Sequence, residues 1–193
     1  MKEKTPENRE RILHAAVRLF TEQGYDAVGV QSLCEAAQIT KPTLYHWFGS
    51  KYGVLQAAVE RYAAEFMAEL EGPLEYRGDV PASLQSITAA ILRITAHYPE
   101  AVRLFLSLRH APRSSESRQA TENFFHELHT RLRGLFASAA LDHGNMRGRE
   151  ISYAVSFLAT VFGYAELVMD DRIQPDEGLA FRIMHQFSHG IYS

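Results

Sequence analysis

The sequence predicts an all-α fold of about nine helices, an N-terminal three-helix unit followed by a larger helical domain. Apolar residues recur at helical spacing along most of the chain. Glycine and proline are sparse, 12 and 7 residues, and fall between the periodic stretches. No stretch shows the alternation of a half-buried strand. We therefore predict two helical domains, residues 1–51 and 52–193.

The composition is that of an ordinary globular chain. Its 193 residues are 46% hydrophobic and 22% charged, too apolar for intrinsic disorder. The net charge of −3 divides into +1 for residues 1–51 and −4 for the rest, so a contact with nucleic acid must be local. The single cysteine, Cys34, excludes an intrachain disulfide and a cysteine cage for zinc.

The chain shows no uninterrupted apolar run of about 18–20 residues. Its first eleven residues are polar and contain no apolar signal core. These observations predict a cytoplasmic protein without a membrane partner.

The first helix is expected over residues 6–23. Thr5 is a candidate N-cap, and Pro6 stands at the first helical position, where its missing N–H does no harm. Gly24 is the expected left-handed end. The apolar stripe consists of Ile12, Leu13, Ala16, Val17, Leu19 and Phe20.

Two short helices follow, over residues 30–37 and 41–48, separated by a tight turn. Thr40 can cap the second of them, and Ser50 can cap a long fourth helix over residues 51–70. Two short helices packed on a longer one are typical of a helix-turn-helix unit.

The helix over residues 41–48 carries the functional signal. Leu44 and Phe48 are four residues apart and are expected to bury against the first helix. A helix that presents Lys, Thr, Tyr and His suits a major groove, although a merely solvated face is the alternative. Trp47 is also open to interpretation as a core anchor. The side chains expected to point outward are Lys41, Thr43, Tyr45, His46 and Trp47.

Residues 8–55 resemble the TetR/AcrR family of bacterial transcriptional regulators. The resemblance rests above all on the unbroken stretch Ile39–Lys51, which matches the recognition helix of that family and the turn after it. Earlier positions contribute as well: Ile12, Ala15, Ala16, Leu19, Phe20, Gly24, Tyr25, Leu33 and Ala37.

The resemblance implies base-edge contacts from Lys41 and Thr43, with His46 as a further candidate. It implies phosphate contacts from the Tyr45 hydroxyl and from Lys51, whose position at a helix start also suits a phosphate. The predicted DNA-binding residues are Gln31, Thr40, Lys41, Thr43, Tyr45, His46 and Lys51.

Two positions depart from the family pattern. Val28-Gly29-Val30 stands where the family commonly has a Thr or Ser that caps the second helix and meets a phosphate, which leaves Gln31 there. Gly53 stands where an acidic or helix-forming residue is usual.

The rest of the chain predicts five more helices and carries no catalytic constellation. Asp79 can cap one helix, and Pro99 opens the next. Apolar spacing then predicts helices over residues 117–141, 149–170 and 175–192.

A stripe of small residues marks the helix over residues 149–170. Small side chains on one face let a partner backbone approach closely, and packing within one subunit is the alternative. The residues are Ser152, Ser156, Ala159 and Gly163. The resemblance implies a dimer with a four-helix interface made by the last two helices of each subunit. We predict a homodimer interface at these residues together with Phe181, Met184 and Ile191.

The resemblance also implies a small effector held between the middle helices. An effector can change DNA binding only by favouring one spacing of the two DNA-binding heads. Aromatic side chains with a few polar tips suit a largely apolar pocket, and each also suits ordinary core. The predicted wall residues are Phe66, Leu70, Ile94, His97, Phe105, Leu108, Phe125, His129, Phe157 and Tyr164.

Nine histidines are many for this length. His126 with His129, and His185 with His189, stand at spacings that can place two imidazoles on one helix face. Solvated or packing histidines are the alternative, and the segment 126–129 lacks the spacing of a zinc-protease motif. We predict no metal and no cofactor.

Together these features predict a DNA-binding transcriptional regulator: a homodimeric repressor of a palindromic operator, released by a small, largely apolar effector. A helical enzyme or carrier and a scaffold that binds only protein are the alternatives. No nucleophile, base and orienting group occur together, and no glycine-rich phosphate loop is present. We therefore expect no enzymatic activity.

Overall fold

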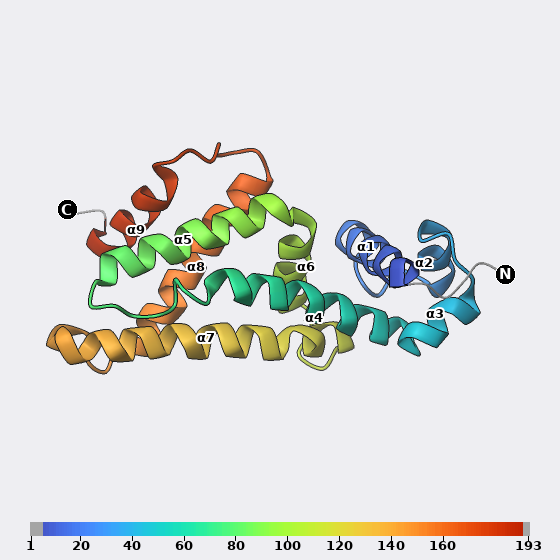
Figure 1. Cartoon of the computed structure of the whole chain (residues 1–193), viewed down its shortest axis with the longest axis horizontal. Coiled ribbons are helices and arrows are strands. Elements are labelled where there is room, and N and C mark those ends of the chain that lie inside the picture. Colours follow the sequence, from blue (N-terminus) through green and yellow to red (C-terminus); the bar gives the residue numbers. More distant parts are fainter. Residues whose placement is uncertain (1–5, 191–193) are drawn as a thin grey trace. The chain divides into compact units, whose positions relative to one another are not determined.

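The computed structural model describes residues 6–190, which form helices and connecting turns without a strand (Figure 1). The predicted all-α class is confirmed. Thr5, the candidate cap of the first helix, lies outside the described residues. The helices are α1 (Pro6–Gln23), α2 (Val30–Ala36), α3 (Lys41–Phe48), α4 (Lys51–Leu70), α5 (Val80–His97), α6 (Pro99–Arg109), α7 (Glu116–Asp142), α8 (Glu150–Met169) and α9 (Leu179–His189), with a 3₁₀ turn at Gly144–Met146.

Local capping signals place several helix ends where the sequence predicts them. The Gly53 N–H donates to Ser50 Oγ at 2.9 Å, and the Ala82 N–H donates to Asp79 Oδ1 at 2.9 Å. Gly24 follows α1 with φ +81°, the left-handed conformation that glycine adopts without a Cβ penalty.

The predicted start of the last helix is wrong by four residues. α9 begins at Leu179 instead of Pro175. Asp176 Oδ1 accepts the Gly178 N–H at 2.8 Å, and Asp176 Oδ2 accepts Arg182 Nη2 at 2.9 Å. A short acidic side chain that bonds backbone two residues ahead competes with the helix, which delays its start.

The described residues separate into two compact units. The N-terminal unit contains the residues up to Ala64 together with Glu100–Asn123, and the C-terminal unit contains Glu65–Pro99 with the residues from Phe124 onward. This division by contacts differs from the domains 1–51 and 52–193, which stay a prediction.

The N-terminal unit is built on the apolar stripe of α1. α1 packs against α2, and α2 against α3. Ile12 and Phe20 of α1 are buried, and Leu44 of α3 is fully buried. Phe48 is only half-buried, in contrast to its prediction as a partner of Leu44. The Arg9 guanidinium lies 5.8 Å from the centre of the Phe48 ring.

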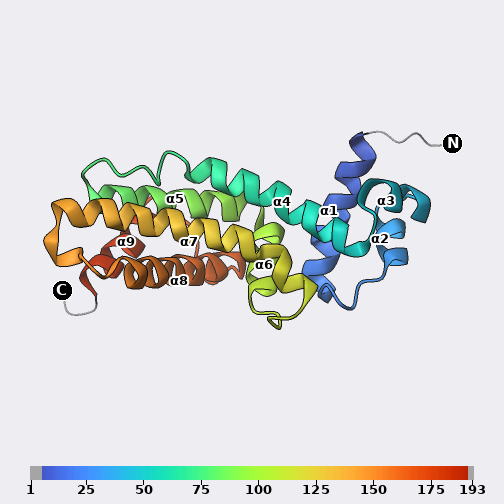
Figure 2. The ribbon, with the colours of Figure 1, turned by 90° about the horizontal axis from the view of Figure 1, so that it is seen from below.

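The C-terminal unit is built around α5, which packs against α8 and α9 (Figures 1 and 2). A phenylalanine cluster fills another part of its core. The Phe66 ring lies edge-on to Phe124 with centroids 5.2 Å apart, and Phe124 and Phe125 are 5.0 Å apart. Phe162 of α8 completes the cluster, 6.3 Å from Phe66.

α8 is the most apolar long helix of the described part of the chain. By length and composition alone its 20 residues could cross a membrane, and 33% of the window that passes this test is buried. A search for uninterrupted apolar runs misses this helix, because single Ser, Gly and Glu residues interrupt its apolar sequence. Core helices of globular proteins share this composition, so the finding is weak evidence of a span. Ile151 and Val155 are 63% and 48% exposed.

The corner between α3 and α4 is closely packed. Gly49 ends α3 with φ +71° and donates its N–H to the Tyr45 carbonyl at 2.9 Å. A Cβ on Gly53 would lie 1.9 Å from the Phe48 carbonyl oxygen, a separation that atoms in contact do not reach. Glycine at this position therefore lets the last carbonyl of α3 lie against the first turn of α4.

We expect Gly53→Ala to lower the free energy of unfolding by about 1–3 kcal/mol through overpacking, although alanine is the better helix former. Urea unfolding measures the effect. Gly134→Ala in α7 is the matched control, since a Cβ there meets nothing within 4 Å; it should be neutral or stabilising. A Gly53→Ala variant as stable as the parent chain would contradict this account of the corner.

Candidate nucleic-acid interface

α3 presents one polar face to solvent. Lys41 and His46 are exposed, and Tyr45 is 48% exposed. Leu44, between them in sequence, is fully buried and turns the helix so that these side chains face outward. The predicted orientation of α3 is therefore observed at Lys41, Leu44, Tyr45 and His46.

Two threonines form the N-terminal cap of α3. The Thr43 N–H points to Thr40 Oγ1 at 3.4 Å, and the two hydroxyl oxygens are 2.9 Å apart in a hydrogen bond. Thr40 is exposed and Thr43 half-buried. The cap fixes both side chains beside Lys41, at the N-terminal end of α3.

The turn between α2 and α3 is held by an arginine that was not among the predicted site residues. Gln38 adopts φ +53°, an uncommon conformation for a residue with a Cβ. Arg11 of α1 donates through Nη2 to the carbonyls of Ala37 and Gln38, and through Nη1 to Asn8 Oδ1 at 3.3 Å. A basic residue on the inner edge of α1 is the only sequence signal for this contact.

The start of α2 carries no side-chain cap at Gly29, as the departure from the family pattern implies. Gln31 is exposed, and its Nε2 donates to Glu35 Oε1 at 2.7 Å. The amide nitrogen of Gln31 is thus engaged within α2.

Lys51 occupies a different environment from the one predicted. Its Nζ donates to the carbonyls of Tyr25 and Val28 at 3.0 and 3.1 Å, and lies 4.2 Å from the centre of the Tyr25 ring. An ammonium group has three N–H donors, and two of them are held inside the unit. A phosphate contact from Lys51 stays a prediction for the third.

Trp47 is half-buried, and its Nε1 is buried without a hydrogen-bond partner among the described residues. Its ring lies 5.7 Å from that of His46, edge to face. Burial of the indole nitrogen favours the interpretation of Trp47 as an anchor over the expectation that it points outward.

The predicted effector residues fall in both units. Phe105 and Leu108 are buried in the N-terminal unit. The others belong to the C-terminal unit, where His129 and Tyr164 are half-buried and His97 is exposed. The buried members there are Phe66, Leu70, Ile94, Phe125 and Phe157. Two surface depressions, at the α2–α3 turn and at the start of α5, include none of these residues.

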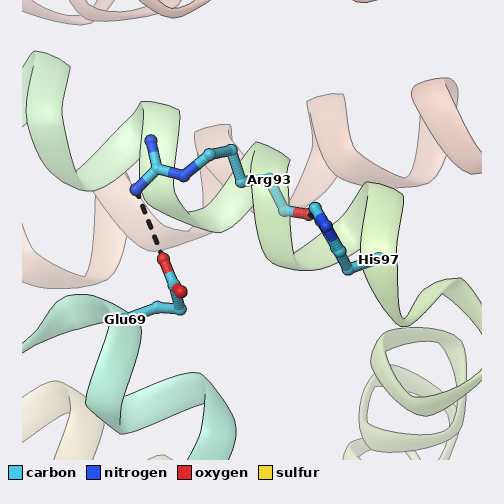
Figure 3. A network of polar contacts seen from close by, with 3 residues as sticks. All are labelled: Glu69, Arg93 and His97. Atoms are coloured by element: carbon cyan, nitrogen blue, oxygen red, sulfur yellow. Dashed lines mark hydrogen bonds and ion pairs between the residues drawn. The ribbon is translucent and has the colours of Figure 1, made fainter.

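His97 belongs to a polar cluster on the surface of the C-terminal unit (Figure 3). Its Nδ1 lies 3.0 Å from the Arg93 carbonyl, one turn earlier in α5. The Arg93 guanidinium pairs with Glu69 at 3.4 Å. His97 is thus placed at the surface, in contrast to its prediction as a wall of a largely apolar pocket.

The predicted small-residue stripe of α8 is exposed along its whole length. Met184 is buried within the subunit, where α9 packs against α5, and its role at an interface stays a prediction. Ile191 lies outside the described residues. The exposed members of the prediction are Ser152, Ser156, Ala159, Gly163 and Phe181. Exposed aliphatic residues that were not predicted accompany them: Ile151, Val155 and Leu167.

The histidine pairs lie on helix surfaces. His185 and His189 stack with ring centroids 4.3 Å apart. No group of three or more residues that could hold a metal occurs among residues 6–190.

These features define a helix-turn-helix protein. Its short helix α3 is anchored by one buried leucine, is capped at its start, and presents lysine, tyrosine and histidine to solvent. The sequence profile of the tetR family of bacterial regulatory proteins matches residues 12–58. HTH-type transcriptional regulator UidR of Escherichia coli (strain K12) is 38% identical over 68 residues, 33% of this chain and 35% of that relative. Residues 12–58 therefore belong to the TetR family. The match of this chain spans about a third of the length of UidR and of ComR.

Solved structures share the whole fold. The transcriptional regulator FadR from Bacillus subtilis, in complex with stearoyl-CoA, has a TM-score of 0.77 at 19% identity, covering 95% of this chain and 99% of that one. The TetR family regulator PfmR from Thermus thermophilus has a TM-score of 0.75 at 24% identity, covering 96% and 97%. At these identities the likeness shows the fold alone.

Replacing the cap residue should loosen α3. We expect Thr40→Ala to lower the free energy of unfolding by about 1 kcal/mol, because the Thr43 N–H loses its side-chain acceptor. Thermal unfolding measures this loss. Thr130→Ala, an exposed substitution within α7, serves as the control and should leave the midpoint unchanged or slightly raised. Equal midpoints for both variants would show that the cap does not stabilise α3.

Proposed function

We propose that this chain is a DNA-binding transcriptional regulator that represses from a palindromic operator as a homodimer and is released by a small, largely apolar effector. DNA binding in a bacterial cell agrees with the expected cytoplasmic location. One observation carries the proposal: the outward face of α3, with Lys41, Tyr45 and His46 exposed on a helix anchored by Leu44.

The chemistry of this face suits duplex DNA. A major groove about 12 Å wide admits one α-helix and offers acceptors on guanine and adenine. Lys41, in the first turn of α3, is the predicted base-edge contact. Tyr45, one turn later, has a hydroxyl that can donate to a phosphate oxygen. Thr43 and Thr40 are already hydrogen-bonded to each other, so we assign them chiefly to holding the start of α3, with base contact secondary.

The exposed face of α8 supports the homodimer. Small residues lie beside the exposed aliphatic side chains Ile151, Val155 and Leu167, a combination that lets two helix backbones approach and buries apolar surface. Two-fold symmetry would place two copies of α3 about 34–36 Å apart, one turn of DNA, which matches a palindromic operator.

The core of the C-terminal unit supports an apolar effector. In the phenylalanine cluster, four aromatic rings from α4, α7 and α8 each have their centroid 5.0–6.4 Å from those of two others. We infer that this core opens around an apolar ligand, since the rings there would give up apolar rather than polar contacts. The structural relative FadR was solved with stearoyl-CoA, whose acyl chain is apolar.

Lys41→Ala tests the DNA-binding face. We expect it to weaken binding to a duplex selected by the parent chain from a random pool by about tenfold or more, and to relax specificity at one base pair. Fluorescence anisotropy with the selected duplex and with its single-base-pair variants measures both. Arg77→Ala removes an equal charge from an exposed loop of the C-terminal unit and should bind as the parent does.

Two outcomes count against the proposal. If the parent chain selects no duplex, it is not a sequence-specific DNA-binding protein. If Lys41→Ala binds the selected duplex as tightly as the parent, the face of α3 is not the reading surface.

Val155→Asp tests the dimer. A charge on the exposed face of α8 cannot be buried without a partner ion, so we expect sedimentation equilibrium to give the monomer mass of 21.8 kDa. The parent chain should give about twice that mass. Gln174→Asp places the same charge in an exposed loop and should remain dimeric. A monomeric parent chain, or a dimeric Val155→Asp variant, would overturn this assignment.

A further inference from the structure

Tyr25 connects three parts of the N-terminal unit. It follows Gly24 in the loop after α1 and is 7% exposed. Its hydroxyl donates to Glu116 Oε2 at 2.8 Å, on the first residue of α7. Its ring lies edge-on to Phe20, with centroids 5.2 Å apart. A buried tyrosine hydroxyl needs a hydrogen-bond partner, and here that partner comes from a helix 91 residues further along the chain.

The same residue holds Lys51. The ammonium lies 4.2 Å from the centre of the Tyr25 ring and bonds the carbonyls of Tyr25 and Val28. Lys51 is the first residue of α4 and stands three residues after Phe48, the last residue of α3. The position of the α3–α4 corner is therefore tied to the loop that contains Tyr25.

A second contact fastens the same region. Thr21 Oγ1 near the end of α1 donates to the Glu100 carbonyl, at the start of α6, at 3.1 Å. The segment 100–123 thus contacts the end of α1 and the following loop at two points, and it belongs to the N-terminal unit. In the chain it is inserted between two stretches of the C-terminal unit, 65–99 and 124 onward. Both ends of the segment are therefore joined covalently to the C-terminal unit.

The hydrogen bond to Glu116 persists at neutral pH. Burial, and then the Glu116 carboxylate, raise the pKa of the Tyr25 hydroxyl well above its usual range. The hydroxyl therefore keeps its proton and donates a hydrogen bond to the carboxylate.

We propose that Tyr25 is a positioning residue for DNA binding, which fixes the α3–α4 corner through Lys51 and joins it to the first residue of α7 through Glu116. This inference rests on the proposed DNA-binding function. Lys51 acts chiefly by orienting the recognition helix, and the Tyr25–Glu116 bond makes that orientation depend on the segment 100–123.

Three variants test the connection. Tyr25→Phe removes the hydroxyl and keeps the ring under Lys51, and Glu116→Ala removes the acceptor. Each should weaken binding to the selected duplex by about tenfold, the effect of one hydrogen bond to a charged group. The double variant should be no weaker than either single one, because both remove the same bond. Tyr76→Phe is the matched control: it breaks another tyrosine–carboxylate bond, to Asp142 at 3.0 Å in the C-terminal unit, and should leave DNA binding unchanged.

The salt dependence separates positioning from phosphate contact at Lys51. We expect Lys51→Met to weaken binding while the slope of log affinity against log salt stays that of the parent. A slope reduced by about one would mean that Lys51 neutralises a phosphate, and would overturn its positioning role. Additive losses in the Tyr25→Phe and Glu116→Ala pair, or unchanged or tighter binding by either, would overturn the role of Tyr25.

Amide hydrogen exchange tests the inference without DNA. Tyr25→Phe and Glu116→Ala should both speed exchange over residues 49–54, the α3–α4 corner, while Tyr76→Phe should not. If the parent chain selects no duplex, the proposed function fails while this measurement still decides whether the connection exists. Exchange at the parent rate in both variants would show that it does not.

Discussion

The eight residues of α3 cannot hold a helix alone, because isolated helices shorter than about 12–15 residues are marginal in water. α3 therefore takes its shape from its anchors. Leu44 buries its inner side, Arg11 bonds the turn before it, and Lys51 fixes the chain after it. The outward side chains are free to meet a ligand because none of them is needed for the packing. The polar face is thus available because the contacts that hold α3 are made by its opposite side and by the segments before and after it.

The helices were predictable because their signals are local. A cap such as Ser50 or Asp79, or a left-handed glycine such as Gly24, acts within four residues of itself, and the sequence shows those residues together. α9 shows the limit of this reasoning. Pro175 is a good helix start, but Asp176 forms a competing turn with Gly178, and the sequence alone does not say which of two local preferences wins.

The outward face of α3 was predictable for the same reason, since spacing alone separates Leu44 from Lys41 and Tyr45. Contacts between distant residues were not. From the sequence, Lys51 is a free cation at the start of a helix. In the structure its ammonium donates to the carbonyl of Tyr25, in a loop 26 residues earlier. Nothing in the sequence distinguishes Arg11 from a surface residue. In the structure its guanidinium donates to the carbonyl of Gln38, in a turn 27 residues later. Met184 carries the apolar character expected of an interface, and only the packing of α9 on α5 shows that the subunit itself buries it.

The close approach of Gly53 to the Phe48 carbonyl has a bearing on exchanging recognition helices between relatives. The end of α3 packs directly against the first turn of α4, so a graft that ends at Phe48 would place a foreign carbonyl against a turn that fits this one. A transplant that preserves the angle at which the helix is presented must carry the chain from Ile39 through Gly53 as a single cassette. Under the proposed function, the segment to be exchanged between relatives is therefore longer than the set of residues that would contact bases.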